Sequence, residues 1–235
     1  MLLTAHQPNY LPYPGFFQKI AAADEFLVVD TTQFVKRGPF GWIHRNKIRT
    51  PNGPIWLTLP VLSKGRYDQA IHEVELDPRR DWAKKHWKSL EWNYRQAPFW
   101  EPYPPGLKEI YERPFTHLSP LTTAIIRWLL DALELERPVH IASELSAGGK
   151  STEYILAFCK ELGADAFLSG THGRDYLTVE RFPVEGIRLH FQEYSPPVYA
   201  PPGKEPIENL SIIDQLFWTG DACVEWVHEA EQTLA

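Results

Sequence analysis

A polar turn rich in proline follows the first apolar stretch of the chain. His6, Gln7 and Asn9 come directly after residues 2–5, and Pro8 lies among them. A histidine can act as a general base or donate to an anion, because its ordinary pKa lies near neutrality. The two side-chain amides can donate to and accept from a sugar, a base or an amide. We therefore predict a catalytic role for His6 and substrate contacts for Gln7 and Asn9, with a packed structural turn as the alternative.

A strand, a helix and a second strand would position this turn. Apolar patterning predicts a strand at 2–5, a helix at 15–23 and a strand at 26–29. Such a unit pairs its two strands in parallel, and ligands gather at the carboxyl ends of parallel strands. Asp30 follows the second strand, so we predict that it is a second catalytic residue, which could orient His6, hold a metal or bind a ribose hydroxyl. A plain strand-end cap is the alternative.

The remainder of the chain predicts an α/β fold. Further strands are predicted at 139–142, 166–168 and 188–192, and helices at 81–94, 106–112, 117–135, 151–162 and 212–231. Asn52-Gly53 separates two strand-like runs and predicts a β-hairpin. We expect one α/β domain over 1–235, with a mostly parallel sheet and flanking helices, similar to nucleotidylyltransferase and Rossmann-like folds. The hairpin would be an insertion at about 38–75, and a helical segment would occupy about 80–135.

Composition narrows the class of protein. The net charge is −6, which argues against a nucleic-acid-binding surface. Cys159 and Cys223 are isolated and predict neither a disulfide framework nor a metal site, as is common in a reducing cytoplasm. No signal peptide is recognisable, and no apolar run reaches the roughly 18 residues of a membrane span. We expect a cytoplasmic protein without a membrane span. We also expect no metal site, since no carboxylate at diagnostic spacing accompanies Asp30, and the oligomeric state stays open.

A dense group of cations stands out in this acidic chain. Its members lie within 36–49 and are Lys36, Arg37, Arg45, Lys47 and Arg49. No acidic residue occurs between Asp30 and Asp68, so these charges have no partner nearby in the sequence. An unpaired group of this kind favours a phosphate or carboxylate ligand. We predict a small, anionic substrate here, with a solvated hairpin face as the alternative.

Four more residues are candidates for the substrate site. Lys85 and His86 lie on a predicted helix and could extend the anion site, although a packed helix face explains them equally well. Tyr10 could stack on a ligand ring, with core packing as the alternative. Gly170 follows a predicted strand, where a missing side chain would let backbone amides approach a ligand; a simple turn after the strand is the alternative.

Several motifs resemble the WbqC-like protein family. The first four are His6-Gln-Pro-Asn-Tyr-Leu-Pro12, Gly15-Phe-Phe-Gln-Lys19, Asp30 with Gln33-Phe34, and Arg45-Asn-Lys47. The later ones are Lys85-His86 with Tyr94, Leu168-Ser-Gly170 with Tyr176, and Leu210-Ser-Ile-Ile-Asp214. The resemblance spans nearly the whole chain in order. It implies that Gln33, Asn46, Tyr94 and Tyr176 also belong to the substrate site.

The same resemblance implies a function. Members of this family often belong to bacterial gene sets for O-antigen, lipopolysaccharide and other surface polysaccharides, and transfer of glycine or another aminoacyl group to an amino sugar has been suggested for some. The first hypothesis is therefore a transferase that moves an acyl or aminoacyl group to an amino sugar or related amine. A nucleotide-sugar or a nucleotide is the ligand class that this implies, and no cofactor is assigned.

A second likeness leaves two alternatives open. The first strand, its His/Gln-Pro turn and the following helix resemble the start of nucleotidylyltransferases and pantothenate synthetases, which hold a triphosphate with His-x-Gly-His. Here Gln7, Pro8 and Asn9 follow His6, and the second histidine is missing. The second hypothesis is an ATP-dependent enzyme that activates a carboxylate. The third is a non-catalytic, ligand-binding accessory protein, because no nucleophile or Gly-rich phosphate loop stands out.

Overall fold

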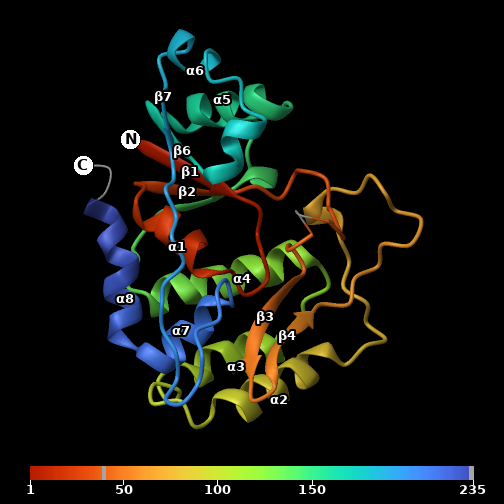
Figure 1. Ribbon diagram of the computed structural model, residues 1–235. Coiled ribbons are helices and arrows are strands. Elements are labelled where there is room, and N and C mark those ends of the chain that lie inside the picture. Colours follow the sequence, from red (N-terminus) through yellow and green to blue (C-terminus); the bar gives the residue numbers. More distant parts are fainter. Residues whose placement is uncertain (39–40, 233–235) are drawn as a thin grey trace.

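A five-stranded parallel sheet forms the centre of the molecule (Figure 1). The computed structural model describes residues 1–38 and 41–232. The strands are β1 (Leu2–His6), β2 (Glu25–Val28), β5 (Val139–Ile141), β6 (Ala166–Ser169) and β7 (Arg188–Phe191), and their order across the sheet is β5-β2-β1-β6-β7. The chain adds β2 and β5 on one side of β1 and then crosses to the other side to add β6 and β7. The strand order therefore reverses between β1 and β6, where doubly wound sheets bind their ligands.

Helices cover both faces of this sheet. On one face lie α1 (Pro14–Ala21), α4 (Leu118–Ala132), α7 (Ile212–Thr219) and α8 (Asp221–His228), and on the other lie α5 (Ser151–Leu162) and α6 (Arg181–Val184). Each face of the sheet packs against its own apolar core. Along β2 and the residue after it, Phe26 and Val28 belong to the first core, on the α1 and α4 side, while Leu27 and Val29 belong to the second, on the α5 and α6 side. The predicted α/β class, with a mostly parallel sheet between helices, is confirmed.

The predicted β-hairpin is also confirmed, and it stands apart from the main sheet. Strands β3 (Arg45–Thr50) and β4 (Gly53–Thr58) pair in antiparallel register, with Arg45 opposite Thr58 and Thr50 opposite Gly53. Helices α2 (Trp82–Tyr94) and α3 (Pro104–Glu112) lie near it (Figure 1). Ile48 and Leu57 point from the hairpin into the first core, so the insertion shares the apolar interior that α1 and α4 form.

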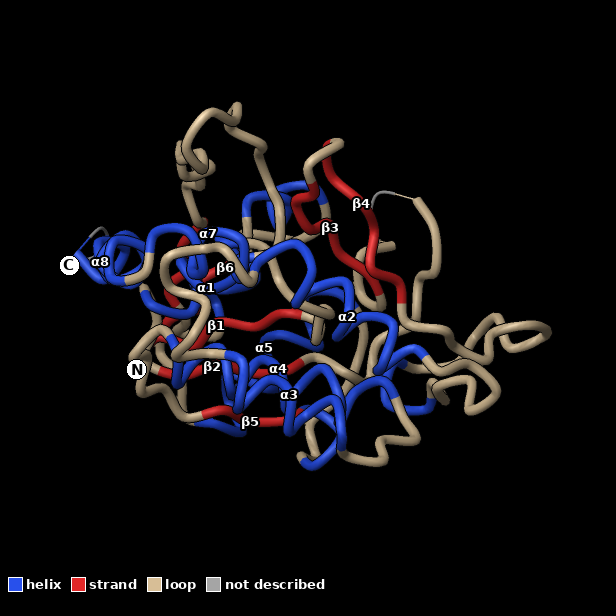
Figure 2. Tube along the Cα trace, turned by 90° about the horizontal axis from the view of Figure 1, so that it is seen from below, coloured by secondary structure: helices blue, strands red, loops and turns tan. Residues whose placement is uncertain are grey.

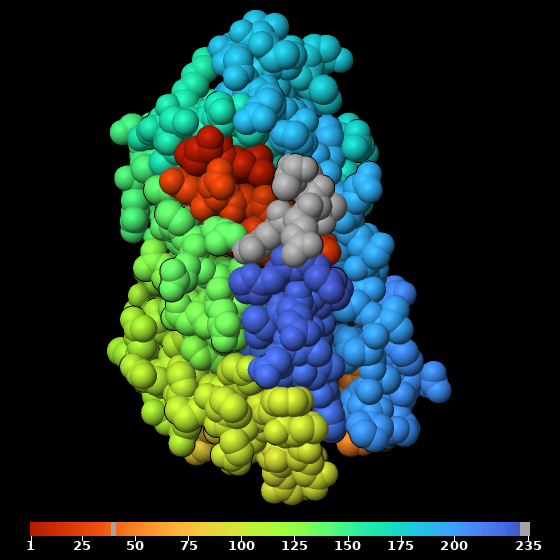
Figure 3. All heavy atoms as spheres, turned by 90° about the vertical axis from the view of Figure 1, so that its left-hand side faces the viewer, coloured from red at the N-terminus to blue at the C-terminus, as the bar shows by residue number. Residues whose placement is uncertain are grey.

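The C-terminal segment differs from its prediction. Instead of one helix over 212–231, α7 and α8 are separate and a short 3-10 helix, η4 (Glu229–Gln232), follows. The break falls at Gly220, whose φ is 52° and where a Cβ would overlap the ring of Phe99. A glycine is therefore required at this bend. Beyond it, α8 packs against α1, and Figure 3 shows α8 below the N-terminal part of the chain and beside the green segment around α4.

The remaining short elements are 3-10 turns. They are η1 (Ile71–Glu73), η2 (Ala142–Glu144) and η3 (Thr171–Asp175). The last two directly follow the carboxyl ends of β5 and β6, so they shape the edge at which ligands are expected. Over residues 1–38 and 41–232, no helix has the length and apolar content to cross a bilayer.

Candidate functional site

The carboxyl ends of the five strands form one polar edge. Figure 2 shows β1, β2 and β5 side by side. His6 is the last residue of β1 and Gln7 follows it, while Ser169 is the last residue of β6 and Gly170 follows it. Asp30 follows β2, Ser143 follows β5 and Gln192 follows β7. The prediction that His6 and Asp30 occupy neighbouring strand ends is thus confirmed. Because side chains alternate along a strand, Val28 and Asp30 face the same side of the sheet as α1 and α4.

His6 is held in one tautomer by the backbone. Its Nδ1 lies 2.9 Å from the carbonyl oxygen of Gln7, and its ring centroid lies 4.8 Å from that of Phe16. A carbonyl oxygen only accepts, so Nδ1 carries the hydrogen and Nε2 is left as an acceptor. Burial, together with the nearby charge of Lys19, lowers the pKa of His6 to about 3. The imidazole is therefore neutral at physiological pH and suited to orienting a substrate N–H or O–H.

Lys19 is the unusual residue of this edge, and it was not predicted as a site residue. It lies on α1 with only 3% of its surface exposed, and its Nζ donates to the carbonyl oxygen of Ala5 at 2.8 Å. A Cβ placed on Gly170 would lie 3.7 Å from that Nζ, so the amine lies between the ends of β1 and β6. No carboxylate within the described part of the chain forms an ion pair with it. Burial lowers the pKa of Lys19 to about 7.

A sequence signal for Lys19 did exist. Phe16 and Ile20 lie three residues before it and one after it on α1, and both are fully buried. Residues three and four apart share a helix face, so a lysine beside such neighbours lies at the margin of the apolar face. A lysine buried without a countercharge is rare, because desolvation disfavours its charged form.

Glycine is required where β6 meets η3. Ser169 ends β6 with 2% of its surface exposed, and a Cβ at Gly173 would overlap its hydroxyl oxygen. The Gly170-Thr-His-Gly173 stretch is thus a tight turn whose second glycine makes room for Ser169. Its first glycine, Gly170, leaves the space next to Lys19 open.

Replacing Gly173 with alanine is expected to destabilise the protein by about 1–3 kcal/mol, because an overpacked methyl group forces Ser169 or the turn to move. Urea unfolding of Gly173→Ala, Ser169→Ala and the double variant measures this. The double variant is expected to lose less than the sum of the two single losses, since alanine at 169 removes the overlapping oxygen. Additive losses would show that the two residues do not compete for this space.

The two amide residues of the first turn have different surroundings. Gln7 is half-buried, and its Nε2 donates to Thr32 Oγ1 at 3.0 Å, which joins the loops after β1 and β2. Asn9 is buried, with 8% of its surface exposed. The Gln7 side chain is therefore held by the loop that follows β2, and its role in binding a substrate stays a prediction.

Asp30 is held by three donors on the same edge. Its carboxylate accepts from Ser119 Oγ at 2.8 Å, from Ser143 Oγ at 2.9 Å and from the Ser143 amide at 3.0 Å. Ser119 belongs to the first turn of α4, where the helix dipole favours a negative charge. Within the described residues no hydrogen bond joins Asp30 to His6. Asp30 thus fixes β2, β5 and α4 together at the floor of a cleft with a volume of about 750 Å³.

Two of the predicted substrate residues lie in the interior. Tyr10 is fully buried, and its hydroxyl lies 2.8 Å from His86 Nδ1 and 2.6 Å from the hydroxyl of Tyr111. Burial lowers the pKa of His86 to about 4 and raises that of Tyr10. These hydrogen bonds connect the first loop to α2 and α3. They favour the alternative of core packing for Tyr10 and His86.

Two others fix the hairpin in place. Asn46 is buried and donates from Nδ2 to the carbonyl oxygen of Leu11 at 2.5 Å, which ties the first loop to β3. Tyr94 is fully buried; its hydroxyl donates to Asp214 Oδ1 at 2.8 Å and accepts from the Arg49 amide at 3.0 Å. Asn46 thus positions the loop that carries His6, while Tyr94 joins the hairpin to Asp214 of α7, and the structure does not bring either side chain to the strand ends.

The predicted cation group is divided among different partners. Arg49 is buried and pairs with Asp214, which lies far along the chain, at 3.2 Å. The Arg45 guanidinium lies over the ring of Trp56 at 4.4 Å, and Lys47 Nζ lies 5.9 Å from the same ring. Lys36 is exposed and donates to Ser63 Oγ at 2.9 Å. Arg49 therefore has a structural partner, while Arg45 and Lys47 remain candidates for an anion on the hairpin.

The other predicted residues lie on the surface. Gln33 is exposed and donates to the Tyr67 carbonyl oxygen at 2.9 Å, and Lys85 is exposed on α2. Tyr176 is 57% exposed just after η3. Within the described residues no group of three or more His, Cys, Asp and Glu side chains has a metal-binding arrangement, and the absence of a metal stays a prediction.

The strand order and the polar carboxyl edge define a doubly wound α/β protein with a candidate site where the order reverses. By sequence the chain belongs to the WbqC-like protein family, whose model matches residues 7–225. It is 32% identical over 232 residues to an uncharacterized protein of Mycobacterium tuberculosis, a match that covers 96% of this chain and 97% of the relative. No solved structure matches the chain significantly.

Proposed function

We propose that the protein is an acyl- or aminoacyl-transferring enzyme with its reaction centre between the ends of β1 and β6. The acceptor would be an amino sugar or related amine, as in the surface-polysaccharide pathways that the family resemblance implies. The observation that carries the proposal is Lys19, which is buried without a carboxylate partner next to His6 and Gly170. Perturbed amines at strand-end sites are typical of catalytic groups.

The chemistry of the transfer follows from these groups. With a pKa of about 7, Lys19 is available as a neutral amine near physiological pH. It would accept the proton of the acceptor nitrogen while that nitrogen bonds to the acyl carbon. The bond from the acyl carbon to the leaving group then breaks, and the leaving group departs with the proton from Lys19. His6 would orient the acceptor by accepting a hydrogen bond from it at Nε2, without taking its proton.

The order of the strands favours a second candidate function, the ATP-dependent activation of a carboxylate. Sheets with this order bind nucleotide phosphates at the same reversal point, and an amine at that point suits a phosphate oxygen. Activation of a carboxylate with ATP would release pyrophosphate when the protein is incubated with ATP and a panel of acids. Release of pyrophosphate would support this function over direct transfer, while its absence across the panel would count against it.

A change of His6 to alanine is expected to lower kcat by about 10²-fold, since it removes the group that orients the acceptor. The assay combines glycyl and acetyl thioesters with UDP-linked amino sugars and detects the acylated product by mass spectrometry. The free energy of unfolding should fall by no more than about 3 kcal/mol, because the change removes the ring contact with Phe16 and, within the described residues, one hydrogen bond, to the carbonyl oxygen of Gln7.

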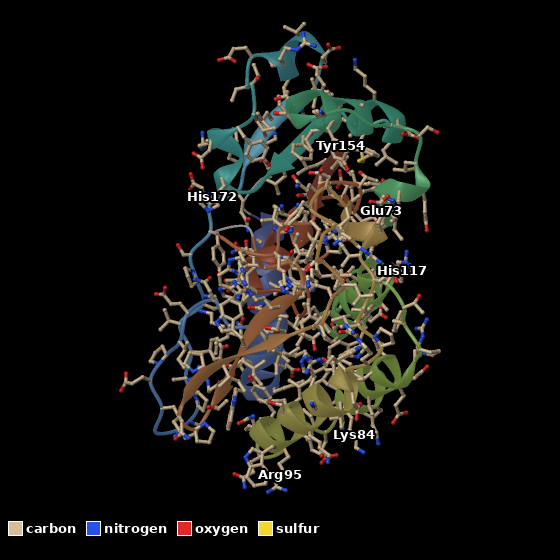
Figure 4. The ribbon with its side chains drawn as sticks, turned by 90° about the vertical axis from the view of Figure 1, so that its right-hand side faces the viewer. Glu73, Lys84, Arg95, His117, Tyr154 and His172 are labelled. Carbon is tan, nitrogen blue, oxygen red and sulfur yellow. The ribbon has the colours of Figure 1, made fainter. Side chains whose placement is uncertain are left out.

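His172→Ala is the matched control for this variant. His172 lies on η3 at the same edge, with its side chain 81% exposed, and is labelled in Figure 4. The His172→Ala protein should transfer the acyl group at the wild-type rate. A His6→Ala protein that transfers as fast as the wild type, or a wild type that acylates none of the amino sugars, would contradict the proposed function.

A further inference from the structure

A cleft opens on the same polar edge, one strand away from His6. It has a volume of about 750 Å³, which lies within the range of small-molecule sites. Asp30 and Ser143 lie at its floor, at the ends of β2 and β5, and α4 forms one wall. His117, at the start of α4, belongs to its lining and is labelled in Figure 4. Adjacent strands lie about 4.8 Å apart, so a ligand over the end of β2 would lie close to the reaction centre at β1.

One face of α4 supplies polar groups to this cleft. Ser119, Thr123, Arg127 and Asp131 all line it, and residues spaced by four share one helix face. Ser119 is occupied by Asp30. Thr123 is 5% exposed, and its Oγ1 has no hydrogen-bond partner among the described residues. Because a buried hydroxyl without a partner is costly, Thr123 marks a position where a ligand atom would complete the hydrogen bonding.

A second group with free capacity lies at the floor. His72 Nδ1 lies 3.1 Å from the carbonyl oxygen of Asp30, so Nδ1 carries the hydrogen and Nε2 can accept from a ligand. Within the described residues, Oδ1 of Asp30 accepts one hydrogen bond, from the Ser143 amide, while Oδ2 accepts two, so Oδ1 can accept another from a ligand. The floor therefore offers acceptors to a ligand that carries N–H or O–H groups.

The charge of the lining selects among ligands. Its acidic members are Asp30, Glu109, Asp131 and Glu144. Its arginines are Arg113 and Arg127, so the carboxylates outnumber the arginines by two. This excess opposes a phosphate and attracts a cation. Phe115 and Trp128 also line the cleft and add the aromatic surface on which a sugar ring can pack.

We propose that this cleft binds a small, hydroxyl-rich molecule that carries a protonated amine, with Thr123 as a direct contact. If the proposed transfer function holds, the cleft is the subsite that receives the acceptor before its amine loses a proton at Lys19. Binding itself requires no donor and no turnover. The two ideas can therefore fail separately.

Isothermal titration with three probes tests the charge selection. In buffer at neutral pH, glucosamine is expected to bind at least about tenfold more tightly than glucose, since its protonated amine adds a charge-assisted contact. Glucose 6-phosphate should show no saturable binding. Equal affinity for all three probes, or no binding by glucosamine, galactosamine and mannosamine, would overturn the proposal.

Two neighbouring threonines provide a matched pair of variants. Thr123→Val should weaken glucosamine binding about fivefold to tenfold without lowering Tm, since its hydroxyl has no partner within the protein. Thr122→Val should leave binding unchanged but lower Tm, because the Thr122 hydroxyl donates to the carbonyl oxygens of Leu118 at 2.9 Å and Ser119 at 3.1 Å. Unchanged binding in Thr123→Val would assign the site elsewhere.

Lys19→Met separates the cleft from the reaction centre. This variant should bind glucosamine like the wild type, because Lys19 does not line the cleft. Normal binding together with absent transfer by the wild type would retain the cleft and reject the transferase. A glucosamine affinity that falls with Lys19→Met as much as with Thr123→Val would reject the cleft as a separate subsite.

Discussion

Lys19→Met is expected to abolish transfer and, at the same time, to raise the free energy of unfolding by roughly 2–4 kcal/mol at neutral pH. The amine is buried with one hydrogen bond, to the Ala5 carbonyl oxygen, and without a countercharge in the described part of the chain. Methionine fills nearly the same space without charge. A variant that is both more stable and inactive is the usual sign that a costly buried group is kept for its chemistry.

The pH dependence of this gain has a defined sign. Burial lowers the pKa of Lys19 from its ordinary 10.5 to about 7 in the folded protein. Between these two values the unfolded chain binds more protons, so the stability of the wild type rises with pH from about 7 to 10.5. The advantage of Lys19→Met is therefore largest and constant below about pH 7, and it shrinks as the pH rises toward 10.5.

Urea unfolding of both proteins across this pH range measures the effect. Lys88→Met, at an exposed position on α2, is the control and should show no pH-dependent gain. Transfer by the wild type should increase as the pH rises through about 7, because only the neutral amine accepts a proton. A Lys19→Met protein that is less stable than the wild type at neutral pH would show that the ammonium has a partner in solution.

Local patterns were sufficient to predict most of the secondary structure. The strand at 2–5, the helix at 151–162 and the hairpin around Asn52-Gly53 are confirmed, because each depends on apolar periodicity or turn chemistry within a few residues. The positions of His6 and Asp30 at strand ends followed from the same patterns. Parallel pairing of β1 and β2 then brought both residues to one edge.

Contacts between distant segments could not be predicted in the same way. The cations of 36–49 have no acidic residue nearby in the sequence, yet Arg49 pairs with Asp214, 165 residues further on. For Tyr10 and His86 the sequence leaves both a substrate contact and core packing open, and the fold buries them against each other. Gly220 breaks the predicted C-terminal helix because Phe99, from another part of the chain, occupies the space of its side chain.

Arg49 and Asp214 form the centre of a buried polar cluster that joins the hairpin to α2 and α7. Asp214 is fully buried and accepts from Arg49 Nε at 3.2 Å, from the Tyr94 hydroxyl at 2.8 Å and from the Tyr199 hydroxyl at 2.6 Å. Arg49 also donates to the Glu205 carbonyl oxygen at 2.9 Å. The cluster thus holds together three segments that are far apart in the sequence.

Arg49→Met and Asp214→Asn are each expected to lower the free energy of unfolding by about 3–5 kcal/mol, because each leaves the partner's charge buried without compensation. Tyr94 and Tyr199 donate to different oxygens of Asp214, and asparagine keeps one acceptor oxygen, so this loss combines the charge with one hydrogen bond. Tyr94→Phe removes one hydroxyl and should lose only about 1–2 kcal/mol. Urea unfolding curves with unchanged m-values would measure these losses.

The double variant Arg49→Met/Asp214→Asn decides between an ion pair and two independent contacts. It removes both charges, so its loss should be smaller than the sum of the single losses by about 2 kcal/mol. The hairpin positions Asn46, which in turn holds the Leu11 carbonyl of the loop that carries His6. The single variants should therefore also slow transfer at temperatures where they remain folded. Additive losses would mean that Tyr94, Tyr199 and the Glu205 carbonyl, rather than the ion pair, keep the hairpin in place.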